Sequence, residues 1–242
     1  MPATTESTRQ QRTLMSSVYD RLRRDLLDGQ LKPGMRLRFE DLKAWYGIGL
    51  SPLREALNRL AAEKLVELEE HKGFRVAPIS KADLLDILFM RKEVESMGIR
   101  LAIEKGDDKW EAGVVAAIHE LNKRDSLTPE GRIDPEWEIR HRAFHYSLVS
   151  ACGSKQLLQI RDLLFDHADR YRRLSHHYPK EARDHALEHN DIAKAVIARD
   201  PEAAAYLIKK HFNRTVEILL SAPDLEIEND APVTTADFLK SD

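Results

Sequence analysis

The sequence contains very little cysteine and no long apolar run, and both absences limit the class of protein. Its 242 residues include a single cysteine, Cys152, which excludes an internal disulfide and indicates a reducing compartment. No stretch approaches the roughly 18–20 consecutive apolar residues that span a membrane. The polar start, MPATTESTRQQRT, lacks the apolar core of a signal peptide. We therefore expect a cytoplasmic protein without a membrane partner.

Sequence motifs of several enzyme classes are also missing. The chain has no G-x-S-x-G elbow and no P-loop. The glycines of YGIGLSP fit the start of a dinucleotide fingerprint, but Pro52 stands where the third glycine is needed and the preceding segment reads as helical. We therefore assign no catalytic residues.

The net charge of −3 divides unevenly along the chain. Residues 13–78 carry 12 Lys or Arg against 10 Asp or Glu, a balance of +2, whereas residues 79–242 carry 24 against 30, a balance of −6. Residues 1–12 add +1, which completes the total. A surface that binds a polyanion is therefore expected in the first third of the chain.

Residues 13–78 have the pattern of a winged helix-turn-helix. Helical spacing of apolar residues begins at Leu14, and a second, short helix ends at the turn GIG. Ser51 is expected to cap the third helix, with Pro52 at its first helical position. The alternating segments LVELEE and FRVAPI then predict a hairpin around the turn HKG.

The third helix has the two faces of a helix that reads DNA. One face is apolar, and the other carries Arg54, Asn58 and Arg59. A recognition helix presents such a polar face to the major groove and makes its contacts from its first turns. The predicted DNA-binding residues of the helix, the segment before it and the wing are Arg38, Ser51, Arg54, Asn58, Arg59, Lys72 and Arg75. An ordinary helix with solvated charges is the alternative.

Beyond Pro78 the apolar residues have helical periodicity throughout. Helices are predicted at about 81–105, 108–124, 135–151, 154–176, 180–199 and 201–221, which together make an all-α bundle. Residues 1–12 are expected to be a disordered tail and residues 223–242 a loose tail. The predicted fold is therefore mainly α, with a DNA-binding domain at 13–78 and a bundle of six or seven helices at 79–222.

Four of the ten histidines are placed so that they could hold a metal ion. His141 and His145 are spaced i,i+4, so both rings leave one face of their helix. His189 and His211 lie on the last two predicted helices, where a closed bundle could bring them to the same centre. Imidazole nitrogen suits Zn²⁺, Ni²⁺ or Cu²⁺. Ordinary surface or core positions are the alternative.

The run from Gly29 to Ser80 resembles the N-terminal winged helix of GntR-family bacterial transcription regulators. The matching motifs are the L-x-P-G turn, the (S/T)-P-x-R-E-A-L-x-R-L helix and the G-F-x-V wing. In that family Ser-Arg commonly precedes the Ser/Thr-Pro, and the arginine usually contacts DNA. Here these positions are Gly49 and Leu50, so the resemblance implies that one expected DNA contact is missing.

The helical part resembles the ligand-sensing FCD domain of the FadR-type branch of this family. The family pattern appears as Arg91 with Glu95, then HRAFH at 141–145, H-x-x-I at 189–192, and a final His211. In metal-containing members an aspartate and three histidines hold a divalent ion, and here His141 replaces the aspartate. The resemblance implies one divalent ion, Zn²⁺ with Ni²⁺ as the alternative, on His141, His145, His189 and His211.

Effectors in this branch are typically small carboxylates that bind at or beside the metal. Three stretches, KGFRVAPIS, KWEAGVVAAIHEL and the PEWE-x2-H-x2-FH pattern, resemble regulators of glutarate and 4-aminobutyrate utilisation. The predicted effector-binding residues are Arg91, Glu95 and Arg170, with Arg173 as an alternative on the same helix.

Together these features predict a homodimeric regulator, a repressor by family tendency, that binds a double-stranded DNA operator and responds to a small carboxylate. The alternative is a metal-dependent enzyme acting on a small carboxylate, which would need a general base beside the metal. HRAFH lacks the glutamate of H-E-x-x-H, although Glu138 precedes His141 by one turn. A scaffold whose helices only mediate association is the third alternative.

Overall fold

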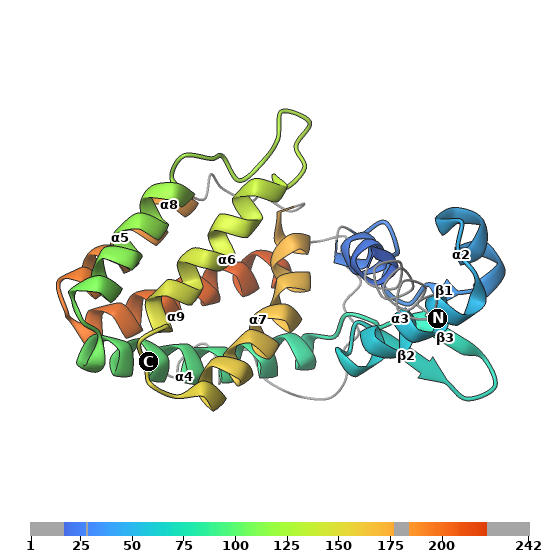
Figure 1. Cartoon of the computed structure of the whole chain (residues 1–242), viewed down its shortest axis with the longest axis horizontal. Helices are drawn as coiled ribbons and strands as arrows, with labels where there is room; N and C mark the ends of the chain where they lie inside the picture. The colour runs from blue at the N-terminus through green and yellow to red at the C-terminus, as the bar shows by residue number, and fades with distance from the viewer. Residues whose placement is uncertain (1–16, 28, 177–183, 222–242) are drawn as a thin grey trace, which may run out of the picture. The chain divides into compact units, whose positions relative to one another are not determined.

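A computed structural model of the chain describes residues 17–27, 29–176 and 184–221 (Figure 1). These residues form two compact units, of which the first ends at Lys81 and the second begins at Ala82. Both predicted tails and the predicted helix start at Leu14 lie outside the described residues. The domain limits 13–78 and 79–222 stay a prediction.

The first unit combines helices with a small antiparallel sheet. After a helical segment at 17–27 come β1 (Arg36–Leu37), α2 (Phe39–Tyr46), α3 (Leu50–Ala62), β2 (Val66–Glu69) and β3 (Gly73–Val76). The strand order is β1-β3-β2, and β2 and β3 form the predicted hairpin, with Glu67 opposite Arg75. The sequence did not predict β1, which pairs only two residues with β3.

The core of this unit fixes which face of α3 is left outside. Leu53, Leu57 and Leu60 are fully buried beside side chains of the other elements, among them Leu22, Leu42, Val66, Phe74 and Val76. Because helix positions repeat every 3.6 residues, burying these leucines turns Arg54 and Asn58 to the exposed face. The packing of the winged unit thus presents the polar side of α3.

The predicted start of α3 was wrong. The cap residue is Gly49 in an extended conformation and the helix begins at Leu50, so Ser51 is not the cap and makes no side-chain cap hydrogen bond. The first helical hydrogen bond runs from the Leu53 amide to the Gly49 carbonyl. Pro52 is tolerated inside the first turn because the amides there have no helical acceptor. The turn before α3 uses Gly47, whose φ of 66° is left-handed and ends α2.

The second unit consists of six helices in the described residues. They are α4 (Lys81–Lys105), α5 (Asp108–Leu121), α6 (Pro135–Val149), α7 (Lys155–Ser175), α8 (His185–Ile197) and α9 (Pro201–Leu220). Asp107, Asp134, Ser154, Asp184 and Asp200 cap α5 to α9 by accepting hydrogen bonds from first-turn amides. The predicted fold class, mainly α with a winged helix-turn-helix before an all-α bundle, is confirmed.

The helices of the bundle pack so that segments distant in sequence lie side by side (Figure 1). α5 packs against α6 and α8, and α9 packs against α7 and α8. The predicted helix at 180–199 is described only from His185, since residues 177–183 lie outside the described part. None of the described helices has the length and apolarity of a membrane span.

Candidate functional site

Four histidines from three helices meet inside the bundle. His141 and His145 come from α6, His189 from α8 and His211 from α9, and all four are buried. One ring nitrogen of each lies within 4.8 Å of the others. The Nε2 atoms of His141 and His145 are 3.1 Å apart. The structure therefore brings together all four residues that the sequence singled out as metal ligands.

The geometry of this four-histidine cluster fits a divalent ion. In a tetrahedral zinc site the bond length sets neighbouring nitrogens about 3.3–3.4 Å apart. The Nε2 pair of His141 and His145 is already near that spacing, and the ligand nitrogens of all four histidines lie within 4.8 Å of one another. The Nδ1 atoms of this pair are buried and have no hydrogen-bond partner among the described residues. The close Nε2 pair is therefore the feature of the cluster that fits a divalent ion best.

The protonation of the cluster also favours metal binding. Burial, with the neighbouring histidines and Arg172, holds the pKa of His141 well below its usual range. Burial and the other histidines do the same for the pKa of His145. Both imidazoles are therefore neutral at pH 7, which is the form that binds a metal.

Glu188 contacts one histidine of the cluster from outside. Its Oε2 atom lies 2.7 Å from Nδ1 of His211. With the proton of His211 assigned to Nδ1, this nitrogen donates to the carboxylate, and Nε2 would be the nitrogen that coordinates a metal ion. Glu188 lies 23 residues before its partner in the sequence, and it was not among the predicted site residues.

A cavity lies beside the cluster and contains two arginines. It is lined by His141, His145 and His211, by Arg91 and Arg172, and by apolar and aromatic side chains including Leu88, Tyr171 and Phe212. Its volume is about 40 Å³, and it is partly open to solvent. A ligand in this cavity would touch the cluster and a guanidinium group at once.

Arg91 is held at this cavity by contacts on two sides. Its guanidinium carbon lies 4.0 Å from the ring centre of Phe212, and its Nη2 atom is 3.4 Å from Oε1 of Glu95. Nε of Arg91 has no hydrogen-bond partner among the described residues. Burial lowers the pKa of Arg91 to about 10, so the side chain is still charged at pH 7. Arg91 is therefore a buried cation whose Nε–H group can donate a hydrogen bond to an anionic ligand.

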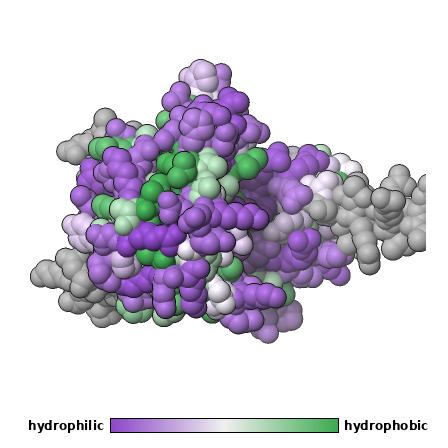
Figure 2. Space-filling model, turned by 60° about the vertical axis from the view of Figure 1, so that its left-hand side comes forward, coloured by the Kyte–Doolittle hydropathy of each residue, from purple (hydrophilic) through white to green (hydrophobic). Residues whose placement is uncertain are grey.

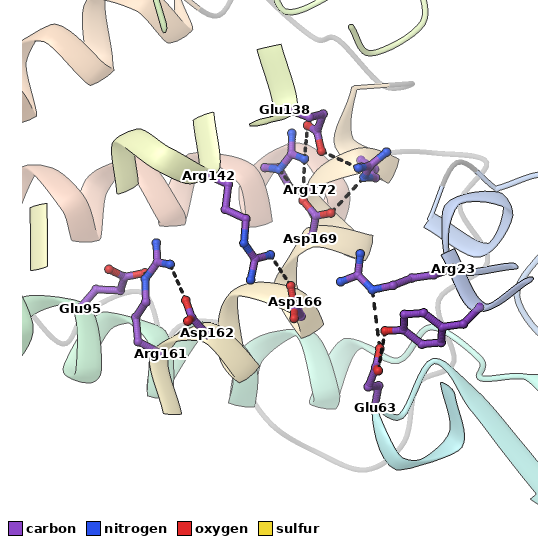
Figure 3. A network of polar contacts seen from close by, with 12 residues as sticks. Arg23, Glu63, Glu95, Glu138, Arg142, Arg161, Asp162, Asp166, Asp169 and Arg172 are labelled. Atoms are coloured by element: carbon purple, nitrogen blue, oxygen red, sulfur yellow. Dashed lines mark hydrogen bonds and ion pairs between the residues drawn. The ribbon is translucent and has the colours of Figure 1, made fainter. Parts of the chain in front are cut away.

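Arg172 belongs to a buried network of charges that Figure 3 shows in stick form. Its Nη2 atom donates to Glu138 and to Asp169, and Arg173 bridges the same two carboxylates. Burial alone would lower the pKa of Arg172, but the carboxylates of Asp169 and Glu138 outweigh it and raise the pKa. Its Nη1 atom has no hydrogen-bond partner among the described residues. The network therefore fixes a charged guanidinium with one free donor beside the cavity.

The predicted effector residues occupy different places in the structure. Arg91 lines the cavity, whereas Glu95 does not line it and accepts a hydrogen bond from Nε of the fully buried Arg161 at 3.1 Å. Arg170 is buried but is not among the residues that line the cavity, and Arg172 takes the expected place. The run RYRR gave a cue for an arginine on α7 but not for which one.

Three of the four predicted DNA-binding residues of α3, namely Ser51, Arg54 and Asn58, share one surface of the winged unit. Leu50, Ser51, Arg54, Glu55 and Asn58 line a shallow depression. Arg38, the residue before α2, is exposed as well. Leu50 itself is 46% exposed, so an apolar side chain stands at the start of the surface that would enter the major groove.

Two other predicted DNA contacts have partners within the winged unit. Arg75 on β3 pairs with Glu67 at 2.8 Å and with Glu69 at 3.2 Å. The guanidinium of Arg59 lies 3.9 Å from the ring centre of Tyr19. Lys72, in the turn of the hairpin, is exposed.

Comparisons with known proteins agree with this arrangement. Residues 14–76 match the family "Bacterial regulatory proteins, gntR family", and residues 86–214 match "FCD domain". The chain is 39% identical over 208 residues to the HTH-type transcriptional repressor GlaR of Escherichia coli K12, covering 84% of this chain and 94% of that relative. It is 34% identical over 210 residues to the uncharacterized HTH-type transcriptional regulator BphR of Paraburkholderia xenovorans LB400, covering 86% of each. Among solved structures, E. coli McbR/YncC matches with a TM-score of 0.67 at 25% identity, over 86% of this chain and 97% of that one.

These relatives are transcriptional regulators, so the interpretation as an enzyme is set aside. Regulators of this kind bind DNA operators with the winged unit and small-molecule effectors with the helical unit. From the matches of both units, this chain is a transcriptional regulator of the GntR family with a C-terminal FCD domain.

Proposed function

We propose that this regulator binds a small carboxylate, a dicarboxylate such as glutarate, at a divalent metal ion held by the four-histidine cluster. Binding would change its affinity for its operator. The observation that supports this most directly is the composition of one cavity, which joins three of the histidines to Arg91 and Arg172. Zn²⁺ suits the all-nitrogen ligand set, and Ni²⁺ is the alternative.

The charge of the cluster favours an anionic ligand. Four neutral imidazoles leave the full charge of a divalent ion uncompensated within its ligand set. When bound, the metal would supply a Lewis-acid position for a carboxylate oxygen. Arg91 would bind the same ligand through a charge-assisted hydrogen bond, which is stronger than a neutral one.

The two arginines of the cavity favour a ligand with two anionic groups. Arg91 projects from α4 and Arg172 from α7, and each has a nitrogen without a protein partner among the described residues. A dicarboxylate can satisfy both, and the resemblance to regulators of glutarate utilisation agrees with that class.

The size of the cavity links binding to a conformational change. A cavity volume of about 40 Å³ leaves little free space for glutarate between the lining side chains. We infer that binding displaces some of the helices that line the cavity, α4, α6, α7 and α9. α4 begins at Lys81, where the winged unit ends, so a shift of α4 would be transmitted along the chain to that unit. The ligand would thus favour one of two placements of the winged helix.

We further propose that the protein acts as a homodimer on double-stranded DNA. Two copies of the α3 surface would read the half-sites of a palindrome. The second unit exposes several large apolar side chains, among them Met97, Val115, Ile139, Ile160, Leu163 and Leu187. Figure 2 shows apolar residues grouped on one otherwise polar face, which suits contact with a second copy. Since the operator is chromosomal DNA, we place the protein in the cytoplasm.

The function can be tested by a ligand screen coupled to DNA binding. Purified protein without a histidine tag is analysed for metal and then screened by thermal shift against dicarboxylates from succinate to adipate, with and without chelator. A dicarboxylate should raise the melting temperature only when metal is present, and the same compound should change binding to DNA from around the protein's own gene. A stabilising ligand that leaves DNA binding unchanged would contradict the coupling. Stabilisation that survives complete metal removal would contradict the metal site.

A further inference from the structure

A second cavity reaches the four-histidine cluster from another side. It lies between α5, α6 and α8 and is lined by Asn122, Arg124, Asp125, Trp137, Asp184 and His185, with the buried His189 as the residue it shares with the cluster. His189 does not line the cavity that contains Arg91 and Arg172, whereas the other three histidines do. We call this second cavity the α8 cavity. A third cavity reaches the cluster at His211, and Glu188, Asp191, Lys209, Lys210 and Arg214 are among its lining residues.

A row of imidazoles connects the α8 cavity with the cluster. The rings of His176 and His185 are half-buried, and their centres lie 5.2 Å apart. The centre of His185 is 6.5 Å from that of His189, one helical turn further along α8. His189 is in turn 4.8 Å from His211 and 5.3 Å from His145. The spacing places a potential metal ligand at each step from the half-exposed pair to the buried centre.

The charges that line these two cavities have opposite consequences for a cation. Among the described residues, the lining of the first cavity contains two guanidinium groups, Arg91 and Arg172, and no carboxylate, which favours a carboxylate ligand over a divalent ion. The lining of the α8 cavity contains the carboxylates of Asp125 and Asp184 and the positive charge of Arg124. This excess of negative charge attracts a divalent ion and should raise its rate of association.

We propose that His185, at the α8 cavity, and the neighbouring His176 form an acceptor site for a divalent cation, from which the ion passes to His189 and the cluster. The carboxylate effector uses the cavity beside Arg91 and Arg172. Metal and effector therefore reach the same centre without competing for one path. This inference rests on the proposed metal site in the cluster.

The route can be tested by the kinetics of metal loading. Metal-free protein is mixed with Co²⁺ in a stopped-flow instrument, and the absorbance of nitrogen-bound Co²⁺ is followed. The double variant His176→Ala/His185→Ala should load roughly ten-fold more slowly than the wild type, as expected when a focusing site is lost. Its final stoichiometry should be unchanged, because the four ligands of the cluster are intact. His119→Ala, which removes an exposed histidine that lines neither cavity, should load at the wild-type rate.

A second variant separates metal capture from a purely structural role of the stacked rings. Asp125→Asn/Asp184→Asn removes both carboxylates, and an asparagine at position 184 can still cap α8. Slower loading in this variant, with a weaker salt dependence, would support the route. An unchanged loading rate in both double variants at full metal occupancy would overturn it. A wild-type protein that takes up no stoichiometric metal would instead overturn the metal site itself.

Discussion

Nδ1 of His211 lies 2.7 Å from Oε2 of Glu188, and this contact fixes which nitrogen of His211 faces the cluster. Glu188→Gln removes the negative charge that makes the bound imidazole a better ligand. Loss of such an orienting carboxylate typically weakens metal affinity about 10–100-fold. Zn²⁺ affinity measured by competition with a chromophoric chelator should fall within that range. Glu217→Gln, at an exposed position on α9, is the matched control and should change nothing.

His145→Ala should go further and abolish stoichiometric binding, since it removes a ligand rather than its support. Retention of a full equivalent of metal in His145→Ala, shown by elemental analysis, would rule out the assignment of this cluster. His145→Asn serves as a second variant if the alanine leaves a cavity that prevents folding.

Replacing His141 with aspartate should lower the affinity of the metal-loaded protein for its carboxylate effector. His141→Asp adds a carboxylate to the ligand set and neutralises part of the metal charge that otherwise attracts the effector. In the metal-loaded protein we expect the Kd for the dicarboxylate, measured by calorimetry, to rise roughly ten-fold or more. His119→Asp adds the same charge at an exposed site and should leave the Kd unchanged. Equal effector affinity in His141→Asp would mean that metal charge does not hold the ligand.

Arg91→Lys should weaken effector binding although it keeps the positive charge. The guanidinium can bind a carboxylate with two parallel hydrogen bonds, whereas an ammonium group acts as a compact point charge. A loss of about ten-fold in affinity is expected for such a change, within the range of a charged hydrogen bond. Arg170→Lys is the matched control, because Arg170 is equally buried but does not line the cavity. If the two variants bind alike, Arg91 is not the clamp.

The difference between Arg170 and Arg172 shows where sequence reasoning stops. Helical periodicity identified α7 and the run RYRR, but neighbouring positions on a helix point about 100° apart. Arg170 and Arg172 are both buried, and Arg172 is the one that lines the cavity and pairs with Glu138, which lies 34 residues earlier on α6. Glu188 escaped prediction for the same reason. By contrast, His141 and His145 were predictable because their spacing alone puts them on one face.

In the winged unit, too, neighbouring residues predicted some features, whereas others depend on residues distant in the sequence. The hairpin was predicted from the alternation of apolar and polar residues in LVELEE and FRVAPI. β1 has only two residues, which is too short to show such an alternation. Arg75 was predicted to contact DNA because it is a cationic residue on the wing, but the register of β2 and β3 places it opposite Glu67. Its pairing with carboxylates comes from strand pairing and not from the residues beside it in the chain.

Arg54→Ala should weaken specific operator binding by about 1–3 kcal/mol, the typical value of a good base contact. Lys72→Ala should instead weaken binding to all sequences and lower the salt slope by about one, as expected for a phosphate contact. Shift assays on operator and unrelated DNA at several salt concentrations distinguish the two effects. Arg75→Ala is expected to have the smaller effect, since its side chain is engaged by Glu67 and Glu69.

Leu50→Arg should alter which operator sequences are preferred, because it puts a donor where an exposed apolar side chain now stands. A selection from randomised half-sites would display the change. An unchanged preference would show that position 50 does not reach the bases.

Two helical glycines should respond in opposite ways to substitution by alanine. A Cβ atom at Gly98 in α4 would lie 2.9 Å from Cγ1 of Val149 and 3.1 Å from Cδ2 of Leu157. Overpacking of this kind costs about 1–3 kcal/mol, which exceeds the gain in helix propensity of about 1 kcal/mol. Gly113 in α5 has no such neighbour within 4 Å among the described residues, so Gly113→Ala should stabilise by about 0.5–1 kcal/mol. Urea unfolding midpoints at constant m would measure both, and a stabilised Gly98→Ala would contradict the packing of α4 on α6 and α7.

The stacking of Trp137 on His141, with ring centres 4.6 Å apart, gives the protein an optical reporter of its own centre. The other two tryptophans lie elsewhere, Trp45 exposed on α2 and Trp110 on α5 with its indole donating to the Ser147 carbonyl. A paramagnetic ion bound to the imidazole beneath Trp137 would quench the emission of that indole far more than the emission of the other two. The fluorescence of the unlabelled chain therefore carries a signal for occupancy of the bundle, separate from the state of the winged unit.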